Sequence, residues 1–232
     1  MSGSPVDPFY AVYSRYKGYE TPVLCTKQMY RWDRDVWGPA ELRPDMSVLE
    51  FGCGTGSFLA YLHAKGVKKI VGVDHDPNLT EIMPKQVRNC LVIGNLWDYI
   101  AENTDNMKFD RIALFDVLEH FSYEDGLKLL KALRKMLTTD GQVILRVPNV
   151  SSPWGIAYQF GDLTHRAAYT PKSLRQMALA AGLAVSACYP HREGSPVRQV
   201  LDRSFHGLLS KIVATPPSIW TANMYAILSQ ER

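Results

Sequence analysis

Short apolar runs alternate with stretches of helical spacing along most of the chain. Glycine, proline or polar residues bound each run, as is typical of buried strands, and the stretches between them place apolar side chains on one helix face. Such alternation favours an α/β fold, a mostly parallel sheet with helices on both faces. The pattern predicts seven strands, at 47–52, 69–74, 90–93, 110–115, 142–147, 183–189 and 223–229.

Local signals mark several helix boundaries. Ser122–Asp125 resembles a capping box in front of a helix expected over 123–138. Thr170-Pro171 opens another helix with proline at its first position, and Gly182 follows its end. Further helices are expected from residue 56 and from about residue 78.

Two segments fall outside the alternation: residues 1–44, rich in Tyr, Trp and charge, and residues 190–221. We therefore expect an N-terminal aromatic cap over 1–44 and one domain over 45–232 that carries a variable insert at about 190–221. Within the insert, 200–213 has apolar helical spacing. Core packing explains this spacing, and a surface that meets a membrane-proximal partner is the alternative.

Three glycines alternate with other residues directly after the first predicted strand, in Glu50-Phe51-Gly52-Cys53-Gly54-Thr55-Gly56. Glycine lets the backbone turn sharply and lets a nucleoside lie close against the chain. Asp74 ends the next predicted strand, eighteen residues after Gly56. An acid at that place binds the hydroxyls of a ribose. The sequence therefore predicts a ligand that carries a ribose.

The details of the loop distinguish between ribose cofactors. The dinucleotide pattern G-x-G-x-x-G is absent, and Glu50 precedes the loop. A carboxylate is unfavourable beside a pyrophosphate and favourable beside an ammonium and a sulfonium. The loop resembles the first motif of the class I S-adenosylmethionine-dependent methyltransferases, and Val73-Asp74 resembles their second. The resemblance implies a Rossmann-like sheet with an antiparallel last strand, and S-adenosyl-L-methionine as cofactor. A nicotinamide enzyme and a non-catalytic binding or scaffold protein are the alternatives.

Composition narrows the alternatives. A chain of 232 residues with 46% apolar content can bury one sizeable core, which leaves little room for the substrate domain of a dehydrogenase. A net charge of +3, without a basic block, argues against nucleic acid. Four cysteines without a C-x-x-C pair, no N-terminal signal and no long apolar run predict a soluble, cytoplasmic protein without stable membrane insertion. The oligomeric state stays open.

The resemblance also implies cofactor contacts at matching positions. Asn95 stands where these enzymes often place an acid that binds adenine, and an amide oxygen can accept the same hydrogen bond. Asp116 follows the fourth predicted strand, at the edge where open α/β sheets bind ligands. The predicted cofactor-binding residues are Glu50, Gly52, Cys53, Gly54, Gly56, Asp74, His75, Asn95, Leu96 and Asp116.

Two further stretches resemble particular methyltransferases. Residues 116–121 resemble the V-L-E-H stretch of quinone and small-molecule O-methyltransferases. Residues 146–175 resemble a P-N…G-D-x-T-H…T-P pattern of bacterial enzymes often associated with sugar, polysaccharide and natural-product pathways. The resemblance implies methyl transfer to a small-molecule or glycan acceptor, at oxygen. N-methylation of an amino sugar or another amine is the alternative.

A hydroxyl acceptor must lose its proton, and histidine is the usual base near neutral pH. The predicted base is His165, with Asp162 three residues away to orient its ring, and His120 is the second candidate. Alternatively, Asp162 and His165 only fasten their loop. We expect no metal, because Glu119, His120, Asp162 and His165 show no tight ligand spacing and imidazole is a poor magnesium ligand.

The aromatic residues of the N-terminal segment recur every three positions at Tyr10, Tyr13, Tyr16 and Tyr19. A hydrophobic face that packs on the sheet edge explains most of this spacing. An aromatic lid over a cationic sulfonium is the alternative.

Overall fold

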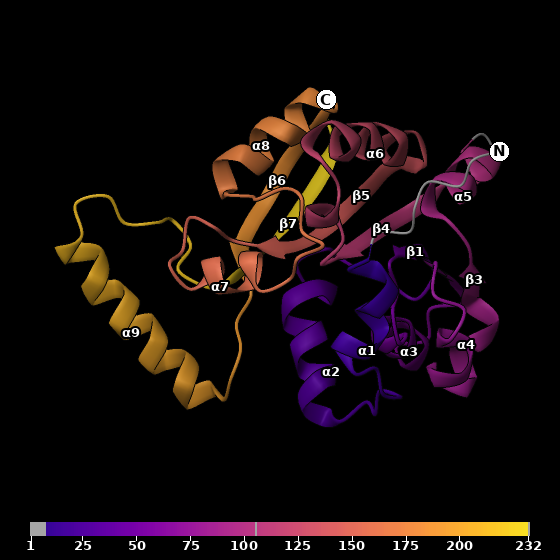
Figure 1. Ribbon diagram of the computed structural model, residues 1–232, viewed down its shortest axis with the longest axis horizontal. Coiled ribbons are helices and arrows are strands. Elements are labelled where there is room, and N and C mark those ends of the chain that lie inside the picture. Colours follow the sequence, from indigo (N-terminus) through magenta and orange to yellow (C-terminus); the bar gives the residue numbers. More distant parts are fainter. Residues whose placement is uncertain (1–7, 105, 232) are drawn as a thin grey trace. The chain divides into compact units, whose positions relative to one another are not determined.

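The computed structural model describes residues 8–104 and 106–231. Their strands form one seven-stranded sheet, flanked by helices, in the order β3-β2-β1-β4-β5-β7-β6 (Figure 1). All seven predicted strands are confirmed within two residues except for the start of β5. The strands are β1 Ser47–Phe51, β2 Lys69–Asp74, β3 Leu91–Ile93, β4 Phe109–Phe115, β5 Leu137–Pro148, β6 Leu183–Pro190 and β7 Asn223–Gln230.

The pairing fixes the edge at which a ligand can bind. β1 pairs in parallel with β2 and with β4, and β2 pairs in parallel with β3. β7 runs antiparallel to both β5 and β6, as the resemblance implied for the last strand. The chain leaves β1 toward β2 and β3 and then returns to β4 on the other side. Ligands of open α/β sheets bind outside the carboxyl ends of strands at such a reversal.

The helices depart from the sequence prediction at several places. The helix expected from about residue 78 is a single turn, because Pro84 follows it and Met83 is extended. The helix expected over 123–138 ends at Lys135, and Leu137 already opens β5. The helices are α1 Tyr13–Lys17, α2 Thr26–Trp32, α3 Ser57–Ala64, α4 Leu79–Ile82, α5 Leu96–Asn103, α6 Tyr123–Lys135, α7 Gly155–Phe160, α8 Pro171–Ala180 and α9 Pro196–Ile212.

The chain divides into two compact units. The first holds the residues up to 114 together with 135–141, and the second holds 115–134 together with 142 onward. The expected division into 1–44 and 45–232 stays a prediction, and residues 1–7 and 232 lie outside the described residues. In the first unit α3 packs on β2, and in the second α8 packs on β6.

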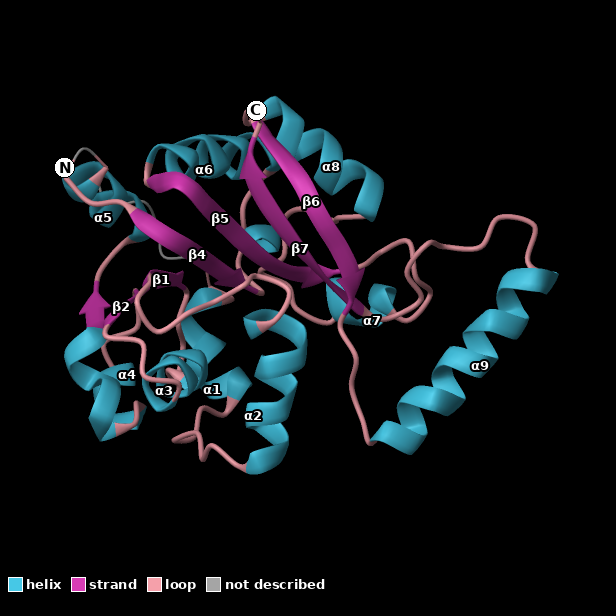
Figure 2. Cartoon of the chain, turned by 180° about the vertical axis from the view of Figure 1, so that it is seen from behind, coloured by secondary structure: helices cyan, strands magenta, loops and turns pink. Residues whose placement is uncertain are grey.

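Helix α9 differs from the other long helices because none of its residues is buried. Both views show it standing apart from β6 and β7 of its own unit (Figures 1 and 2). Most of its apolar residues are more than half exposed, as are Leu201, Phe205 and Leu208. Core packing therefore does not explain the apolar spacing of 200–213.

The contact between α3 and β2 depends on one glycine. A Cβ built on Gly72 would lie 2.5 Å from Leu59 Cδ1 and 2.9 Å from Cys53 Sγ. Leu59 is fully buried, and Cys53 belongs to the glycine loop. Gly72 therefore sets how closely the helix after the loop approaches the strand that ends at Asp74.

We expect Gly72→Ala to lower the free energy of unfolding by about 1 to 3 kcal/mol, because the added methyl group overpacks a tight contact. Gly207→Ala is the matched control, since a Cβ on Gly207 of α9 meets nothing within 4 Å. It should leave stability unchanged or raise it by up to about 1 kcal/mol through helix propensity. Urea unfolding of both variants measures the difference. Equal stability of the two would show that β2 and α3 pack less closely than described.

Candidate functional site

The glycine loop connects β1 to α3 and is fastened to β2. Gly52 N and Cys53 N both donate to Val73 O, at 2.8 and 3.3 Å. Gly54 and Gly56 adopt φ angles of +50° and +77°, which residues with side chains rarely adopt. Gly56 directly precedes α3, which confirms that the predicted turn leads into a helix.

Asp74 holds the loop from the end of β2. Its Oδ2 accepts a hydrogen bond from Gly54 N at 2.9 Å, and its Oδ1 accepts one from Asp76 N at 3.1 Å. The side chain is 10% exposed. Because each carboxylate oxygen can accept two hydrogen bonds, both oxygens keep capacity for the hydroxyls of a ribose. Asp74 thus caps its turn and is also placed to bind a diol.

The shifted pKa of the Cys53 thiol indicates negative charge around the glycine loop. Burial raises the pKa of the Cys53 thiol well above its ordinary value, and the carboxylates of Glu50 and Asp74 raise it further. Cys53 therefore stays a neutral thiol. Two carboxylates near one loop favour a cationic ligand and disfavour a pyrophosphate.

Two aromatic residues of the N-terminal segment pack at different places in the first unit. Trp32 packs on Phe58 of α3, with ring centroids 4.9 Å apart, as a structural face does. Tyr10 instead meets the ring of His75 edge-on at 5.9 Å, and His75 Nδ1 lies 3.5 Å from Asp74 Oδ1. Tyr10 therefore lies beside His75, the residue that follows Asp74, and its expected role as a lid stays a prediction.

Asn95 has a structural role that the sequence did not indicate. Its Oδ1 accepts a hydrogen bond from Trp97 N at 2.7 Å, so Asn95 caps α5, and Leu96 is the first residue of that helix. Gly94 N donates to Asp74 O at 2.9 Å, which ties the cap to the end of β2. The expected adenine contact of Asn95 and Leu96 stays a prediction.

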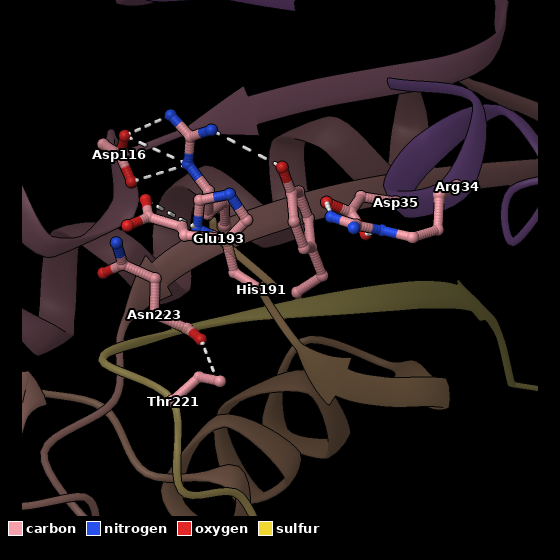
Figure 3. Close-up of polar contacts among 9 residues, drawn as sticks. Arg34, Asp35, Asp116, His191, Glu193, Thr221 and Asn223 are labelled. Atoms are coloured by element: carbon pink, nitrogen blue, oxygen red, sulfur yellow. Dashed lines mark hydrogen bonds and ion pairs between the residues drawn. The ribbon is translucent and has the colours of Figure 1, made fainter. Parts of the chain in front are cut away.

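Asp116 follows β4 with a φ angle of +56°. Its carboxylate accepts hydrogen bonds from Arg146 of β5, at 3.0 and 3.1 Å from Nε and at a shorter distance from Nη2 (Figure 3). Arg146 Nη1 also lies 3.4 Å from Tyr225 Oη. Burial lowers the pKa of Arg146, but Asp116 and Tyr225 outweigh it and raise that pKa overall. Asp116 is therefore held in place as an anion, and its contact with a cofactor stays a prediction.

Main-chain hydrogen bonds bring the two predicted bases together in the second unit. Arg166 N and Ala167 N both donate to Glu119 O, at 2.8 and 3.0 Å, so the segment after His165 is fixed beside the segment 118–120. The rings of His120 and His165 meet edge-on, with centroids 4.7 Å apart. Residues 45 positions apart in the sequence thus form one cluster with Glu119, which is fully buried.

Hydrogen bonds fix the tautomer of His165. Its Nδ1 lies 2.9 Å from Gln159 O, a carbonyl that can only accept, so Nδ1 carries the hydrogen and Nε2 carries the lone pair of the neutral ring. Asp162 Oδ2 lies 3.9 Å from His165 Nε2. Asp162 is therefore near the basic nitrogen, Nε2, and the carbonyl of Gln159 orients the ring through its hydrogen bond with the other ring nitrogen, Nδ1. The sequence did not indicate Gln159, because a main-chain carbonyl has no residue signature.

His120 is oriented through Thr164. Thr164 Oγ1 lies 2.5 Å from Asp162 Oδ1, to which it donates, and 2.9 Å from His120 Nδ1. Because the Thr164 hydroxyl donates its hydrogen to the Asp162 carboxylate, Thr164 Oγ1 accepts a hydrogen bond from His120 Nδ1. Nε2 of neutral His120 then carries the lone pair. Thr164 N also donates to Asp162 Oδ1 at 3.0 Å. Thr164 was part of the recognised stretch but was not predicted as a site residue.

The insert forms a pocket of about 390 Å³. The rings of His206 and Trp220 stack at 5.4 Å with an interplanar angle of 8°. Burial lowers the pKa of His206, while Asp202 opposes that shift, so the surroundings of the ring favour its neutral form. His191, also from the insert, packs edge-on against Tyr225 at 5.3 Å. The residues that line the pocket include Arg192, Glu193, Asp202, Arg203, His206 and Trp220.

A sequence model of the methyltransferase domain family matches residues 30–187. A ribosomal protein L11 methyltransferase from Thermosipho africanus is 34% identical over 105 residues, which are 45% of this chain and 38% of that protein. The chain thus matches about two fifths of the length of this curated relative.

Solved structures share the fold. A SAM-dependent methyltransferase from Archaeoglobus fulgidus superposes with a TM-score of 0.70 at 16% identity, covering 97% of this chain and 100% of that one. A magnesium protoporphyrin IX methyltransferase from Synechocystis with bound SAH gives a TM-score of 0.61 at 14% identity, covering 95% of each chain.

The loop fits S-adenosylmethionine, the cofactor implied by the sequence. Among residues 8–104 and 106–231, and apart from its two chain neighbours, no atom lies within 4 Å of a Cβ built on Gly54, so the backbone presents an open face there. Asp74 is placed to bind the ribose, and Glu50 and Asp74 supply the negative charge that suits an ammonium and a sulfonium. The cofactor supplies an electrophilic methyl group on sulfur.

Asp74→Ala should weaken binding of S-adenosylhomocysteine roughly tenfold to a hundredfold, because a charge-assisted hydrogen bond contributes about 1.5 to 3 kcal/mol. Calorimetry on the folded variant gives the affinity. Asp45→Ala, at an exposed carboxylate ion-paired with Arg43, is the control and should bind normally. Unchanged affinity in Asp74→Ala would refute the ribose assignment.

Gly54→Val should abolish binding of the same ligand while the protein stays folded, because the side chain enters the open face of the loop and not the core. Gly66→Val is the matched control. Its φ of +82° imposes the same kind of backbone strain, and its built Cβ meets only Pro44, at 4.0 Å. Thermal melting should show comparable losses of stability in both variants, and calorimetry should show lost binding in Gly54→Val alone. Normal binding by Gly54→Val would place the cofactor elsewhere.

Proposed function

The chain belongs to the methyltransferase domain family, and from that premise we propose that it is an S-adenosylmethionine-dependent enzyme that methylates a hydroxyl group of a small molecule or glycan. The observation that carries this proposal is the fixed tautomer of His165. A hydroxyl is a poor nucleophile until its proton leaves, so an oxygen acceptor calls for an oriented base, whereas a neutral amine does not.

His165 meets the requirements of a base. The bond between its Nδ1 and Gln159 O holds the ring and directs the lone pair to Nε2. Its side chain is only 7% exposed, which limits competition from water. Asp162 Oδ2, 3.9 Å from Nε2, stabilises the imidazolium that forms when the ring takes a proton. His120, oriented through Thr164, is the second candidate for the same task.

The remaining work of the protein is positioning. Methyl transfer from a sulfonium is an in-line displacement, in which the acceptor must be aligned and water excluded. The pocket of the insert supports an acceptor of this class. Its stacked His206 and Trp220 offer a flat apolar surface, and Arg192 and Arg203 offer donors for carboxylate, phosphate or hydroxyl groups. A polar, ring-shaped acceptor, as in polysaccharide or natural-product pathways of bacteria, suits such walls.

Two alternatives concern the acceptor. N-methylation of an amino sugar or another amine needs less help from a base. A protein acceptor is suggested by the relative named as a ribosomal protein L11 methyltransferase, with the 105 matched residues as its support. A screen with labelled methyl donor against hydroxylated, amine and protein acceptors separates the three.

The proposed location is the cytoplasm. All four cysteines are free, as expected of a reducing compartment. Within 8–104 and 106–231, no helix is both long and apolar enough to cross a membrane. We propose no nucleic-acid partner, because the net charge is only +3.

His165→Ala should lower turnover roughly 10²- to 10⁴-fold with a hydroxyl acceptor, because proton removal loses its base. Its affinity for S-adenosylhomocysteine should change little. Wild-type turnover should rise with pH as imidazole becomes neutral, since only neutral imidazole accepts a proton. Asp162→Asn should show a smaller defect.

His63→Ala, at an exposed position of α3, is the control for these measurements and should keep normal turnover. If His165→Ala keeps near-normal turnover with the true acceptor, His165 is not the base. That outcome would favour His120 or an amine acceptor.

A further inference from the structure

We propose that Glu119, His120 and His165 form a binding site for one borderline divalent metal ion, such as zinc or cobalt. One ligand atom from each lies within 4.8 Å of the others. Two ligands of a single ion, bonded at about 2.1 Å, stand roughly 3.4 to 4.2 Å apart. The widest separation in the cluster therefore needs to close by roughly 0.6 to 1.4 Å. No other group of this kind occurs among the residues that the structure describes.

The donor set decides which metals fit. Imidazole suits zinc, cobalt, nickel and iron, and two imidazoles with one carboxylate form a known type of zinc and iron site. Magnesium prefers oxygen ligands, so the sequence argument against magnesium still holds. The expectation of no metal also relied on the wide spacing of these residues along the chain. The fold removes that objection, because main-chain hydrogen bonds hold the segment after residue 165 beside residues 119–120.

The hydrogen bonds behind the cluster support the proposal independently. In most metal sites a ligating histidine donates its other ring N–H to a carbonyl or carboxylate, which fixes the ring and its tautomer. His165 does so to Gln159 O, and His120 does so through Thr164 to Asp162. Both rings thus direct the lone pair of Nε2 away from these supports. A single general base needs only one histidine whose tautomer is fixed by a hydrogen bond at Nδ1, whereas this cluster holds two such histidines.

A bound ion would change the role of the cluster in the proposed function. With both Nε2 atoms as ligands, His165 no longer takes the proton of the acceptor. The cation lowers the pKa of an acceptor hydroxyl, which then loses its proton to solvent. Three protein ligands leave a position open for that hydroxyl. This role rests on the proposed function, whereas the binding of metal does not.

The test measures metal binding without cofactor or acceptor. Protein treated with a chelator and then freed of it is titrated with zinc, cobalt, manganese and magnesium ions by calorimetry. We expect one equivalent of zinc or cobalt to bind, and magnesium to bind far more weakly. The absorption bands of bound cobalt should report nitrogen and oxygen ligands. Absence of stoichiometric binding of any of these ions to the wild type would overturn the proposal.

Variants assign the ligands. His120→Ala and His165→Ala should each weaken zinc binding a hundredfold or more, and Glu119→Gln and Thr164→Val at least about tenfold. His63→Ala is the control and should bind as the wild type does. Circular dichroism confirms that each variant is folded. Zinc binding that survives in folded His120→Ala and His165→Ala would place the ion elsewhere, for example at a cysteine, and would also overturn the proposal.

The failure of this proposal is distinct from failure of the proposed function. If the wild type binds no metal but methylates a hydroxyl through His165 in the presence of chelator, only the metal site is wrong. If it binds zinc through these residues but methylates no hydroxyl in any screen, the oxygen acceptor is wrong and the metal site stands.

Discussion

The hydrogen bond from Gly54 N to Asp74 Oδ2 is the contact on which the cofactor side of the structure depends. It joins the loop after β1 to the acid at the end of β2, and Gly54, which donates it, adopts a positive φ that glycine tolerates. Gly72 lets α3, which begins after the loop, lie close to the same strand. The loop, the acid and the helix thus form one rigid support, and the open backbone of Gly54 is what remains for a ligand.

Charge makes this support selective. Glu50 is nearly buried, and with Asp74 it raises the pKa of the Cys53 thiol further than burial alone would. Keeping two carboxylates near one loop is costly unless a ligand or hydrogen bonds compensate them. A cationic nucleoside supplies that compensation and a pyrophosphate does not. The position of Glu50 directly before the glycine loop already indicates this preference in the sequence.

The sequence predicted most of the fold because its signals are local. Strand boundaries follow from apolar runs, and Asp74 follows from its position after a glycine loop. The role of Asn95 as a helix cap, the one-turn length of α4 and the exposure of α9 depend on neighbours that no local pattern specifies. The meeting of Glu119 with His165 depends on main-chain hydrogen bonds between Glu119 and residues 166–167, and the support from Gln159 O leaves no trace in the sequence.

The buried carboxylate of Glu119 constrains what the histidine cluster can do. A carboxylate that is 0% exposed requires positive charge or hydrogen bonds close to it. A divalent cation supplies the charge and leaves both imidazoles neutral. Two oriented lone pairs beside one buried carboxylate therefore suit a metal ion, whose open coordination position is where the substrate oxygen would bind.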